Sequence, residues 1–337
     1  MILFTDVSLA FYKTLFFNEL ARKDDILVVY KDNPHRPFRG KDFLDGEMNY
    51  NHIILKGSRV ESYRQLIKVL LSVKYDKLVV GGYDNFIAWI SVCISPRKKN
   101  GIIVESTFRE TRKKGFRVLA KRLFFKRVRT AYVCGKSHAD LVKAFGFRGK
   151  IVNIGTVGLI HRVPQPHYKE RSQVKDFLFV GRLTKVKNLE WLIDRFAQHP
   201  NLTLTIIGAG ELESKLKAIS PPNVLILGPM NNMDLPKYYQ AADVFVLASI
   251  SEPYGLVVEE ALNNGTPVLL SDMIGCQDNL VVANNVGLVF QHNDVADFEN
   301  KLAHICNVEF YNHLRLNVSK MDFERHANNM VNSFAEN

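Results

Sequence analysis

Short hydrophobic runs alternate along the chain with longer stretches in which hydrophobic residues recur every three or four positions. The uninterrupted runs predict strands that are buried on both faces, and the periodic stretches between them predict helices. Sheets with helices on both faces are usually parallel, so the alternation predicts an α/β fold. In the amino-terminal half the predicted strands cover residues 2–5, 26–30, 53–55, 78–80, 102–104 and 131–133.

The alternation stops between residues 158 and 176, where Pro164 and Pro166 occur, and this stretch is the candidate linker. Because 337 residues are many for one core, we expect two domains. The prediction is two Rossmann-like, doubly wound domains, residues 1–160 and 161–310, facing across a cleft. Residues 311–337 form a predicted helical segment, for which a return to the first domain is one option. The second series of strands is expected at residues 177–180, 202–207, 224–227, 244–247, 267–270 and 287–290.

The stretch from Ser251 to Leu262 predicts a turn between a buried strand and a helix. The first N–H groups of a helix are unpaired and attract anions, and Gly255 allows a phosphate to approach the backbone closely. Glu252 lies before the turn and Glu260 lies about two helical turns beyond it. A diphosphate at the turn would have sugar hydroxyls near Glu252 and ribose hydroxyls near Glu260. The alternative is that Glu259 and Glu260 are ordinary solvated carboxylates of a first helical turn.

Two cations follow the first predicted strand of the second domain. Arg182 lies at the end of this strand and Lys187 opens the next predicted helix, so both are placed to neutralise a diphosphate on the Gly255 turn. Taken singly, residues of these types are more often surface charges. The turns that contain Gly208 and Gly210, and later Gly228 and Met230, are weak signals alone, because glycines recur at such turns for steric reasons.

These segments occur in a fixed order: Val-Gly-Arg-Leu with Lys187, Gly-Ala-Gly-Glu, Gly228, Ala-Asp-Val-Phe-Val, the stretch from Glu252 to Glu260, and Gly-Thr-Pro-Val. Over residues 176–305 the sequence closely resembles the retaining family-four glycosyltransferases of the GT-B fold. The resemblance implies that Glu252 lies near the donor sugar and Glu260 near the ribose. It also implies that Arg182 and Lys187 contact the diphosphate and that the region from Gly228 to Met230 lies near the base. Further donor contacts are implied for the backbone at Tyr254, Gly255, Leu256 and Val257, beside the phosphate and sugar, and for the turn with Gly208 and Gly210.

The amino-terminal half departs from the family pattern. Where many members have a glycine-rich loop after the first strand, this chain has residues 6–9, with Ser8 as the candidate donor contact. Where many have a histidine after a middle strand, this chain has Glu105, which we expect to replace it in catalysis. A helix cap is the alternative for Glu105. Ligands of such sheets bind beyond the carboxyl ends of the strands, so the loops at residues 6–8, 81–85 and 105–109 are the candidate sites of this domain.

The net charge of +11 is unevenly distributed, because residues 1–165 carry 31 basic and 14 acidic side chains. Residues 109–129 hold ten of these cations, interleaved with hydrophobic residues at helical spacing, which is typical of a helix that binds an anionic membrane surface. The alternative is that the hydrophobic stripe belongs to the core and the cations are solvated. Nucleic acid is not expected as a partner, because no recognised binding module occurs. The longest apolar run, residues 86–94, is too short to span a bilayer.

The sequence therefore predicts a metal-independent hexosyltransferase-type enzyme that moves a sugar, with retention, from a nucleotide-diphosphate sugar to a saccharide acceptor. The acceptor is expected to be lipid-linked and the setting to be bacterial surface-polysaccharide synthesis. No cofactor is expected besides the donor as co-substrate, and the four cysteines predict buried, reduced thiols rather than a metal site. We expect a cytoplasmic protein on the inner face of the membrane. Two alternatives stay open: a nucleotide-sugar epimerase or phosphorylase of the same fold, and a non-enzymatic membrane- or nucleic-acid-binding module.

Overall fold

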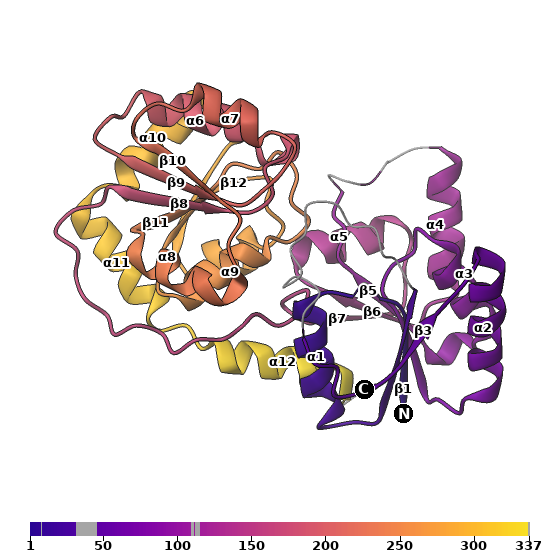
Figure 1. The fold of residues 1–337 in the computed structure, drawn as a ribbon. Coiled ribbons are helices and arrows are strands. Elements are labelled where there is room, and N and C mark those ends of the chain that lie inside the picture. Colours follow the sequence, from indigo (N-terminus) through magenta and orange to yellow (C-terminus); the bar gives the residue numbers. More distant parts are fainter. Residues whose placement is uncertain (8, 32–45, 109–110, 112–114, 336–337) are drawn as a thin grey trace. The chain divides into compact units, whose positions relative to one another are not determined.

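A computed structural model describes the chain except for residues 8, 32–45, 109–110, 112–114 and 336–337 (Figure 1). The described residues divide into two units. The first contains the residues up to Leu159 and those from Arg325 onward, and the second contains the residues from Ile160 to Glu324. Both units are α/β, as the alternation of runs predicted.

The first unit is built on a parallel sheet of seven strands in the order β3-β2-β1-β4-β5-β6-β7. Every strand predicted from its hydrophobic run is present. The last strand was not predicted, because it is short and half-exposed at the sheet edge and has only two hydrophobic residues. The strands are β1 (Ile2–Val7), β2 (Ile26–Lys31), β3 (Asn51–Leu55), β4 (Lys77–Val80), β5 (Asn100–Val104), β6 (Thr130–Val133) and β7 (Lys150–Asn153). The helices are α1 (Phe11–Ala21), α2 (Arg59–Ser72), α3 (Phe86–Ile94), α4 (Phe116–Lys126), α5 (Lys136–Ala144) and α12 (Phe323–Ala335).

The C-terminal helix completes the core of the first unit. Phe334 of α12 packs against Phe4 and Phe16, at ring-centroid distances of 5.8 and 5.2 Å, and stacks on Tyr132 at 4.2 Å. Lys77 at the start of β4 donates a hydrogen bond to the carbonyl oxygen of Phe334. Side chains that are distant in sequence thus share one aromatic cluster around β1 and α1.

The second unit is built on a parallel sheet of six strands in the order β10-β9-β8-β11-β12-β13. All of its strands match the predicted runs to within one residue at each end. They are β8 (Asp176–Val180), β9 (Thr203–Ile207), β10 (Val224–Gly228), β11 (Val244–Leu247), β12 (Val268–Ser271) and β13 (Gly287–Phe290). The helices are α6 (Leu189–Ala197), α7 (Glu213–Ile219), α8 (Leu235–Ala241), α9 (Leu256–Asn263), α10 (Val295–Ile305) and α11 (Val308–Val318).

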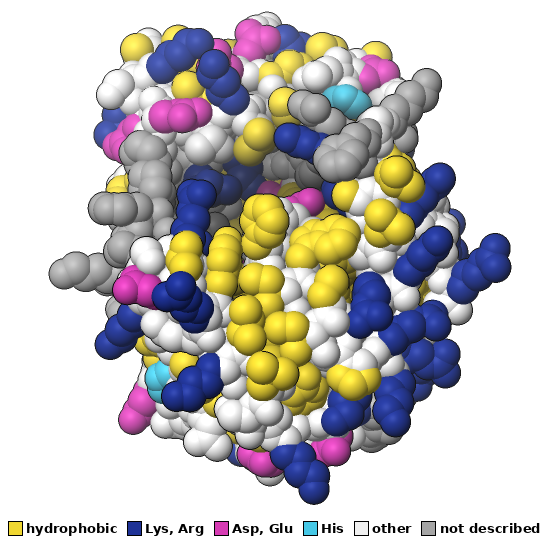
Figure 2. All heavy atoms as spheres, turned by 90° about the vertical axis from the view of Figure 1, so that its right-hand side faces the viewer, with side chains coloured by type: hydrophobic (Ala, Val, Ile, Leu, Met, Phe, Trp, Pro, Cys, Tyr) yellow, Lys and Arg dark blue, Asp and Glu magenta, His cyan; other side chains and the backbone are white. Residues whose placement is uncertain are grey.

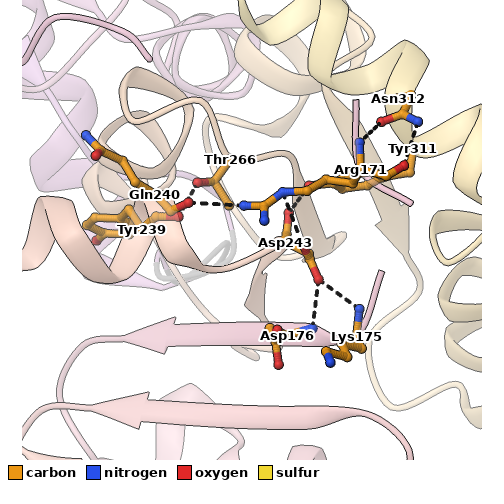
Figure 3. Close-up of polar contacts among 9 residues, drawn as sticks. All are labelled: Arg171, Lys175, Asp176, Tyr239, Gln240, Asp243, Thr266, Tyr311 and Asn312. Atoms are coloured by element: carbon orange, nitrogen blue, oxygen red, sulfur yellow. Dashed lines mark hydrogen bonds and ion pairs between the residues drawn. The ribbon is translucent and has the colours of Figure 1, made fainter. Parts of the chain in front are cut away.

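A buried aspartate fixes the irregular segment before β8 to the second unit (Figure 3). Asp243 accepts hydrogen bonds from the backbone N–H groups of Lys175 and Asp176, at 2.9 and 3.0 Å, and pairs with Arg171. Tyr311 of α11 donates to the carbonyl oxygen of Asp243 at 2.7 Å. The aspartate of the Ala-Asp-Val-Phe-Val motif therefore has a structural task.

The same contacts correct the expected boundary at residue 311. Helix α11 belongs to the second unit, because Tyr311 is buried against Asp243 there, and the chain joins the first unit only from Arg325. A single helical segment over residues 311–337 was predicted because both helices are amphipathic, and periodicity does not identify the surface that each one covers.

The cysteines also differ from expectation in part. All four are free, and Cys134 and Cys276 are buried as predicted, but Cys93 is exposed. It lies on the exposed side of α3, and Cys306 is only partly buried. Among the described residues, no group of three acidic, histidine or cysteine side chains is arranged to hold a metal ion. In the same part of the chain, no helix has the length and hydrophobicity needed to cross a bilayer.

Candidate functional site

In each sheet the strand order reverses at one point, and the loops that follow the two strands there diverge and leave space for a ligand. In the first unit this point lies between β1 and β4, and in the second it lies between β8 and β11. Arg182, Lys187, Glu252 and Gly255 lie in the loops after β8 and β11, whereas Glu105 follows β5 and the remaining glycine turns follow β9 and β10.

In the second unit, the loops after β8 and β11 meet through an ion pair. Lys187 closes a 3-10 turn after β8, and Glu252 lies between β11 and α9. The Lys187 ammonium pairs with the Glu252 carboxylate, and both side chains are largely buried. The backbone of Glu252 is held from the other side, since its N–H donates to Met273 and its carbonyl oxygen accepts from Gly275. Lys187, which the sequence assigned to the diphosphate of a donor, and Glu252, which it assigned to the sugar, thus lie together at the strand-order reversal.

Helix α9 begins directly beside this pair. Gly255 precedes it with a φ of +98°, a backbone conformation that a side chain would strain, and an added Cβ would lie 2.8 Å from Ile274. The predicted turn is therefore present, and the helix presents its first N–H groups, at Leu256 and Val257, at the carboxyl edge of the sheet. Such a helix start favours negative charge.

The two consecutive glutamates of α9 are not ordinary solvated carboxylates. Glu259 is buried and accepts a hydrogen bond from the Tyr254 hydroxyl at 3.1 Å. Tyr254 is itself 3% exposed, so it offers a ligand little more than its backbone. Glu260 is half-buried and accepts from the hydroxyl of Tyr239 on α8 at 3.0 Å.

Burial raises the pKa of Glu260 to about 7. The nearby Glu259 adds to this effect, and the hydrogen bond from Tyr239 opposes it. A carboxyl with a pKa near neutrality exchanges its proton readily when a ligand changes its surroundings. A raised pKa of this size is typical of functional carboxylates, although buried structural groups show it as well.

The remaining candidates of the second unit follow β8, β9 and β10. Arg182 is exposed on the loop after β8. Gly208 and Gly210, after β9, lie so close to this loop that a side chain on either would collide with the carbonyl oxygen of Gly181 or Leu183. Both positions therefore require glycine so that the Arg182 loop can pack closely against them, which is the steric reason that the sequence left open. Gly228 and Met230 follow β10, which β9 separates from β8.

The first unit contains a cavity of about 640 Å³ at its strand-order reversal. The three loops singled out in the sequence contribute to its lining: Asp6 and Val7 at the end of β1, residues 81–85 after β4, and Glu105 with Ser106 after β5. Ser8 and Arg109, which belong to the same loops, lie outside the described residues. The remaining lining residues include Leu9, Lys13, Tyr30, Lys31, Met48, Ile54, Tyr63, Phe86, Ile87 and Ile103.

Two polar pairs mark this cavity. Asp6 adopts a φ of +60° and accepts a hydrogen bond from the Asn85 side chain. Burial raises the pKa of Asp6 to about 6, the neighbouring Asp84 adds to the rise, and Asn85 and Lys31 oppose it. Neither Asp6 nor Asn85 was assigned a role from the sequence. The signal for Asp6 was its position directly after a buried strand.

Glu105 forms an ion pair with Lys13 of α1 rather than capping a helix. Lys13 is buried. Burial has the largest single effect on the pKa of Lys13 and would lower it, but the Glu105 carboxylate, Tyr12 and Cys134 together hold the pKa above its usual value. Lys13 was missed in the sequence, although a single cation among the aromatic residues 11–17 is an unusual pattern for a core-facing helix.

Residues 165–320 match the family model of the glycosyl transferases group 1. An O-antigen biosynthesis glycosyltransferase of Escherichia coli is 37% identical over 134 residues, which cover 37% of this chain and 39% of that protein. Another Escherichia coli protein is 30% identical over 172 residues, covering 47% of this chain and 41% of that protein. Its name is UDP-Gal:α-D-GlcNAc-diphosphoundecaprenol α-1,3-galactosyltransferase. The matches thus span about two fifths of the length of these relatives.

A sucrose-phosphate synthase from Thermosynechococcus elongatus has a similar structure, with a TM-score of 0.73 at 18% identity, over 99% of this chain and 98% of that one. At this identity the likeness shows the fold alone, which is that of GT-B glycosyltransferases. The GT-B fold and the resemblance to this family, both predicted from the spaced motifs, are confirmed.

Proposed function

We propose, from the match of residues 165–320 to the group 1 glycosyl transferases, that this chain transfers a sugar from a nucleotide-diphosphate sugar to a saccharide acceptor. The observation that carries the proposal is the Lys187–Glu252 ion pair beside the start of α9, at the strand-order reversal of the second unit. Cation, carboxylate and helix N-terminus are the three groups that a diphosphate with a sugar attached requires.

Lys187, Arg182 and the N–H groups of α9 bind the diphosphate in this proposal. Lys187 exchanges its Glu252 partner for the phosphate, and Glu252 then accepts hydrogen bonds from the sugar hydroxyls. These fixed positive groups stabilise the negative charge that grows on the leaving diphosphate. They supply the charge that a divalent cation supplies in other transferases, so the proposed reaction is metal-independent.

Glu260 binds the ribose. As a carboxylate it accepts two hydroxyl hydrogen bonds, and its ionisation follows ligand binding because its pKa lies near 7 in the free protein. Tyr239 holds one of its oxygens and thereby orients the carboxylate.

The acceptor saccharide binds in the cavity of the first unit. Carboxylate, amide and ammonium groups from Asp6, Asn85, Lys13 and Glu105 suit sugar hydroxyls, and Tyr63 and Phe86 add apolar walls. In the reaction the bond from the anomeric carbon to the leaving phosphate oxygen breaks and a bond to the acceptor oxygen forms. The hydroxyl proton passes to the leaving phosphate, and the anomeric configuration is retained. We propose a lipid-linked acceptor in surface-polysaccharide synthesis, in line with the names of the two Escherichia coli relatives.

A thermal-shift screen of nucleoside diphosphates and their sugars tests donor binding, since a ligand of the folded state raises the melting temperature. One nucleotide should stabilise the wild type, and Lys187→Met and Arg182→Ala should each weaken its binding at least tenfold. The matched control is Lys185→Met, two residues from Lys187 and exposed. Equal binding by wild type and both variants would contradict the proposed site.

The donor found in the screen is then incubated with and without a saccharide acceptor, and products are followed by mass spectrometry and NMR. A product with the donor's anomeric configuration is expected only when acceptor is present. An epimerised sugar formed from donor alone would favour the epimerase instead.

A further inference from the structure

Helices α2, α3 and α4 of the first unit expose hydrophobic side chains on one face (Figure 2). Phe86 is 71% exposed, Leu119 57% and Leu123 48%. The nine residues of α3 include no charged side chain, although the helix lies at the surface. Surface helices normally turn polar residues to water. We define the apolar face as Val60 and Tyr63 of α2, Phe86, Trp89, Ile90 and Cys93 of α3, and Leu119 and Leu123 of α4.

Ring contacts link the three helices that carry the apolar face. The rings of Tyr63 and Phe86 join α2 to α3, with centroids 6.4 Å apart, and Trp89 packs on Phe124 of α4 at 5.2 Å. Phe124 is fully buried, so one side of α4 fills the core while Leu119 and Leu123, four residues apart, lie on its outer side. The hydrophobic stripe predicted for residues 109–129 is therefore divided between core and surface.

Cations border this face. Arg117, Arg122 and Lys126 of α4 are exposed, and so are Arg97 and Lys98 directly after α3. Figure 2 shows dark-blue side chains gathered beside the yellow ones. Hydrophobic side chains bordered by lysine and arginine are complementary to a bilayer with anionic headgroups, which takes up both kinds of group at one level.

We propose that the apolar face is the surface by which this chain binds a lipid bilayer containing anionic lipids. Hydrophobic side chains enter the boundary of the acyl chains, and the cations contact headgroup phosphates. A second copy of the chain fits this face less well, because a two-fold dimer would bring the same cations of both copies close together. This surface includes α3 and part of α2, and therefore extends beyond the basic stretch recognised in the sequence.

The apolar face meets the cavity of the first unit, since Tyr63 and Phe86 belong to both. An amphiphile with a saccharide headgroup could place this headgroup on Asp6 and Asn85 while its lipid remains in the bilayer beside Phe86. This last step rests on the proposed function, whereas membrane binding itself does not.

Flotation with vesicles of phosphatidylcholine and phosphatidylglycerol tests the surface. Binding should require the anionic lipid and weaken with salt. The double variants Leu119→Ser/Leu123→Ser and Arg122→Glu/Lys126→Glu should each reduce it at least tenfold. Both pairs are exposed, so the fold should tolerate the changes, which circular dichroism checks. The matched controls are changes of exposed side chains in the second unit, Leu225→Ser/Leu227→Ser for the leucines and Lys215→Glu/Lys217→Glu for the cations. Each control variant should bind the vesicles with an affinity within twofold of the wild type.

The proposal would be overturned if both test variants bound the vesicles as tightly as the wild type does. It would also be overturned if the wild type bound vesicles of pure phosphatidylcholine as tightly as vesicles with phosphatidylglycerol. A dimer in solution that the same variants dissociate would assign the face to a second copy instead. Transfer to a water-soluble acceptor should survive Leu119→Ser/Leu123→Ser. If no transfer occurs with any protein while vesicle binding follows the variants, the membrane surface stands and the proposed reaction fails.

Discussion

Replacing Glu260 with glutamine should remove a pH-dependent destabilisation of the second unit. Burial raises the pKa of Glu260 to about 7, from an ordinary value of 4.5 that it regains on unfolding. A carboxyl whose pKa is higher in the folded state stabilises the fold fully below the unfolded pKa. This contribution is lost as the pH rises from about 4.5 through about 7. The wild type should therefore lose stability over this range relative to a variant without the titrating group.

The magnitude follows from the two pKa values. Their difference corresponds to at most about 3.4 kcal/mol, of which about 2.5 kcal/mol is lost between pH 5 and pH 8. Because Glu260 is half-buried rather than fully buried, solvent screening reduces the loss to about 1–2 kcal/mol. Glutamine keeps an oxygen that accepts the Tyr239 hydrogen bond but carries no charge, so Glu260→Gln should not show this loss.

Urea unfolding at pH 5 and pH 8 measures the effect. The chain has two tryptophans, and in a Trp89→Phe background Trp191, which stacks on Phe290, reports on the second unit alone. Exposed Glu309→Gln on α11 is the matched control and should change stability equally at both pH values. If Glu260→Gln and wild type differ by the same free energy of unfolding at pH 5 and pH 8, Glu260 does not have a raised pKa in the folded protein.

Three further predictions concern the donor, the acceptor and the fold. Binding of a nucleotide-diphosphate sugar at pH 7 should release about half a proton, because ribose hydroxyls favour ionised Glu260. Calorimetry in buffers of different ionisation enthalpy measures the release, and Glu260→Gln should abolish it. Asp6→Asn should raise the acceptor KM about tenfold while leaving donor affinity unchanged, since one charged hydrogen-bond partner is lost. Steady-state kinetics would contradict this if donor affinity fell instead. Phe334→Ala should destabilise the first unit by about 3–5 kcal/mol. Thermal unfolding followed by Trp89 fluorescence in a Trp191→Phe background tests it, and an unchanged melting temperature would rule out the packing role of α12.

The sequence predicted the strands well because buried parallel strands are continuous hydrophobic runs, as in residues 244–247. The half-exposed edge strand β7 lacks such a run and was missed. The loops after β1, β4 and β5 were identified as candidate sites because the carboxyl ends of parallel strands meet at one edge of the sheet, and those after β8 and β11 were identified from their cations, the predicted helix start and the spaced motifs.

Side-chain partners were harder to predict. Lys187 and Glu252 were each identified from the sequence, but their ion pair was not, because the two residues are 65 positions apart and only the folded backbone brings them together. The burial of Glu259 and the pairing of Lys13 with Glu105 were missed for the same reason. The stripe on α4 shows a further limit: periodicity indicates which residues share a helix face, but not whether a neighbouring element covers them.

Hydrogen–deuterium exchange with and without the nucleotide found in the screen locates the donor site on the chain. We expect slower exchange on binding in peptides covering residues 181–188 and 251–264, because the ligand contacts the loops after β8 and β11 and the start of α9. Protection confined to the loops at residues 81–85 and 105–107, with no change in those two peptides, would contradict this location.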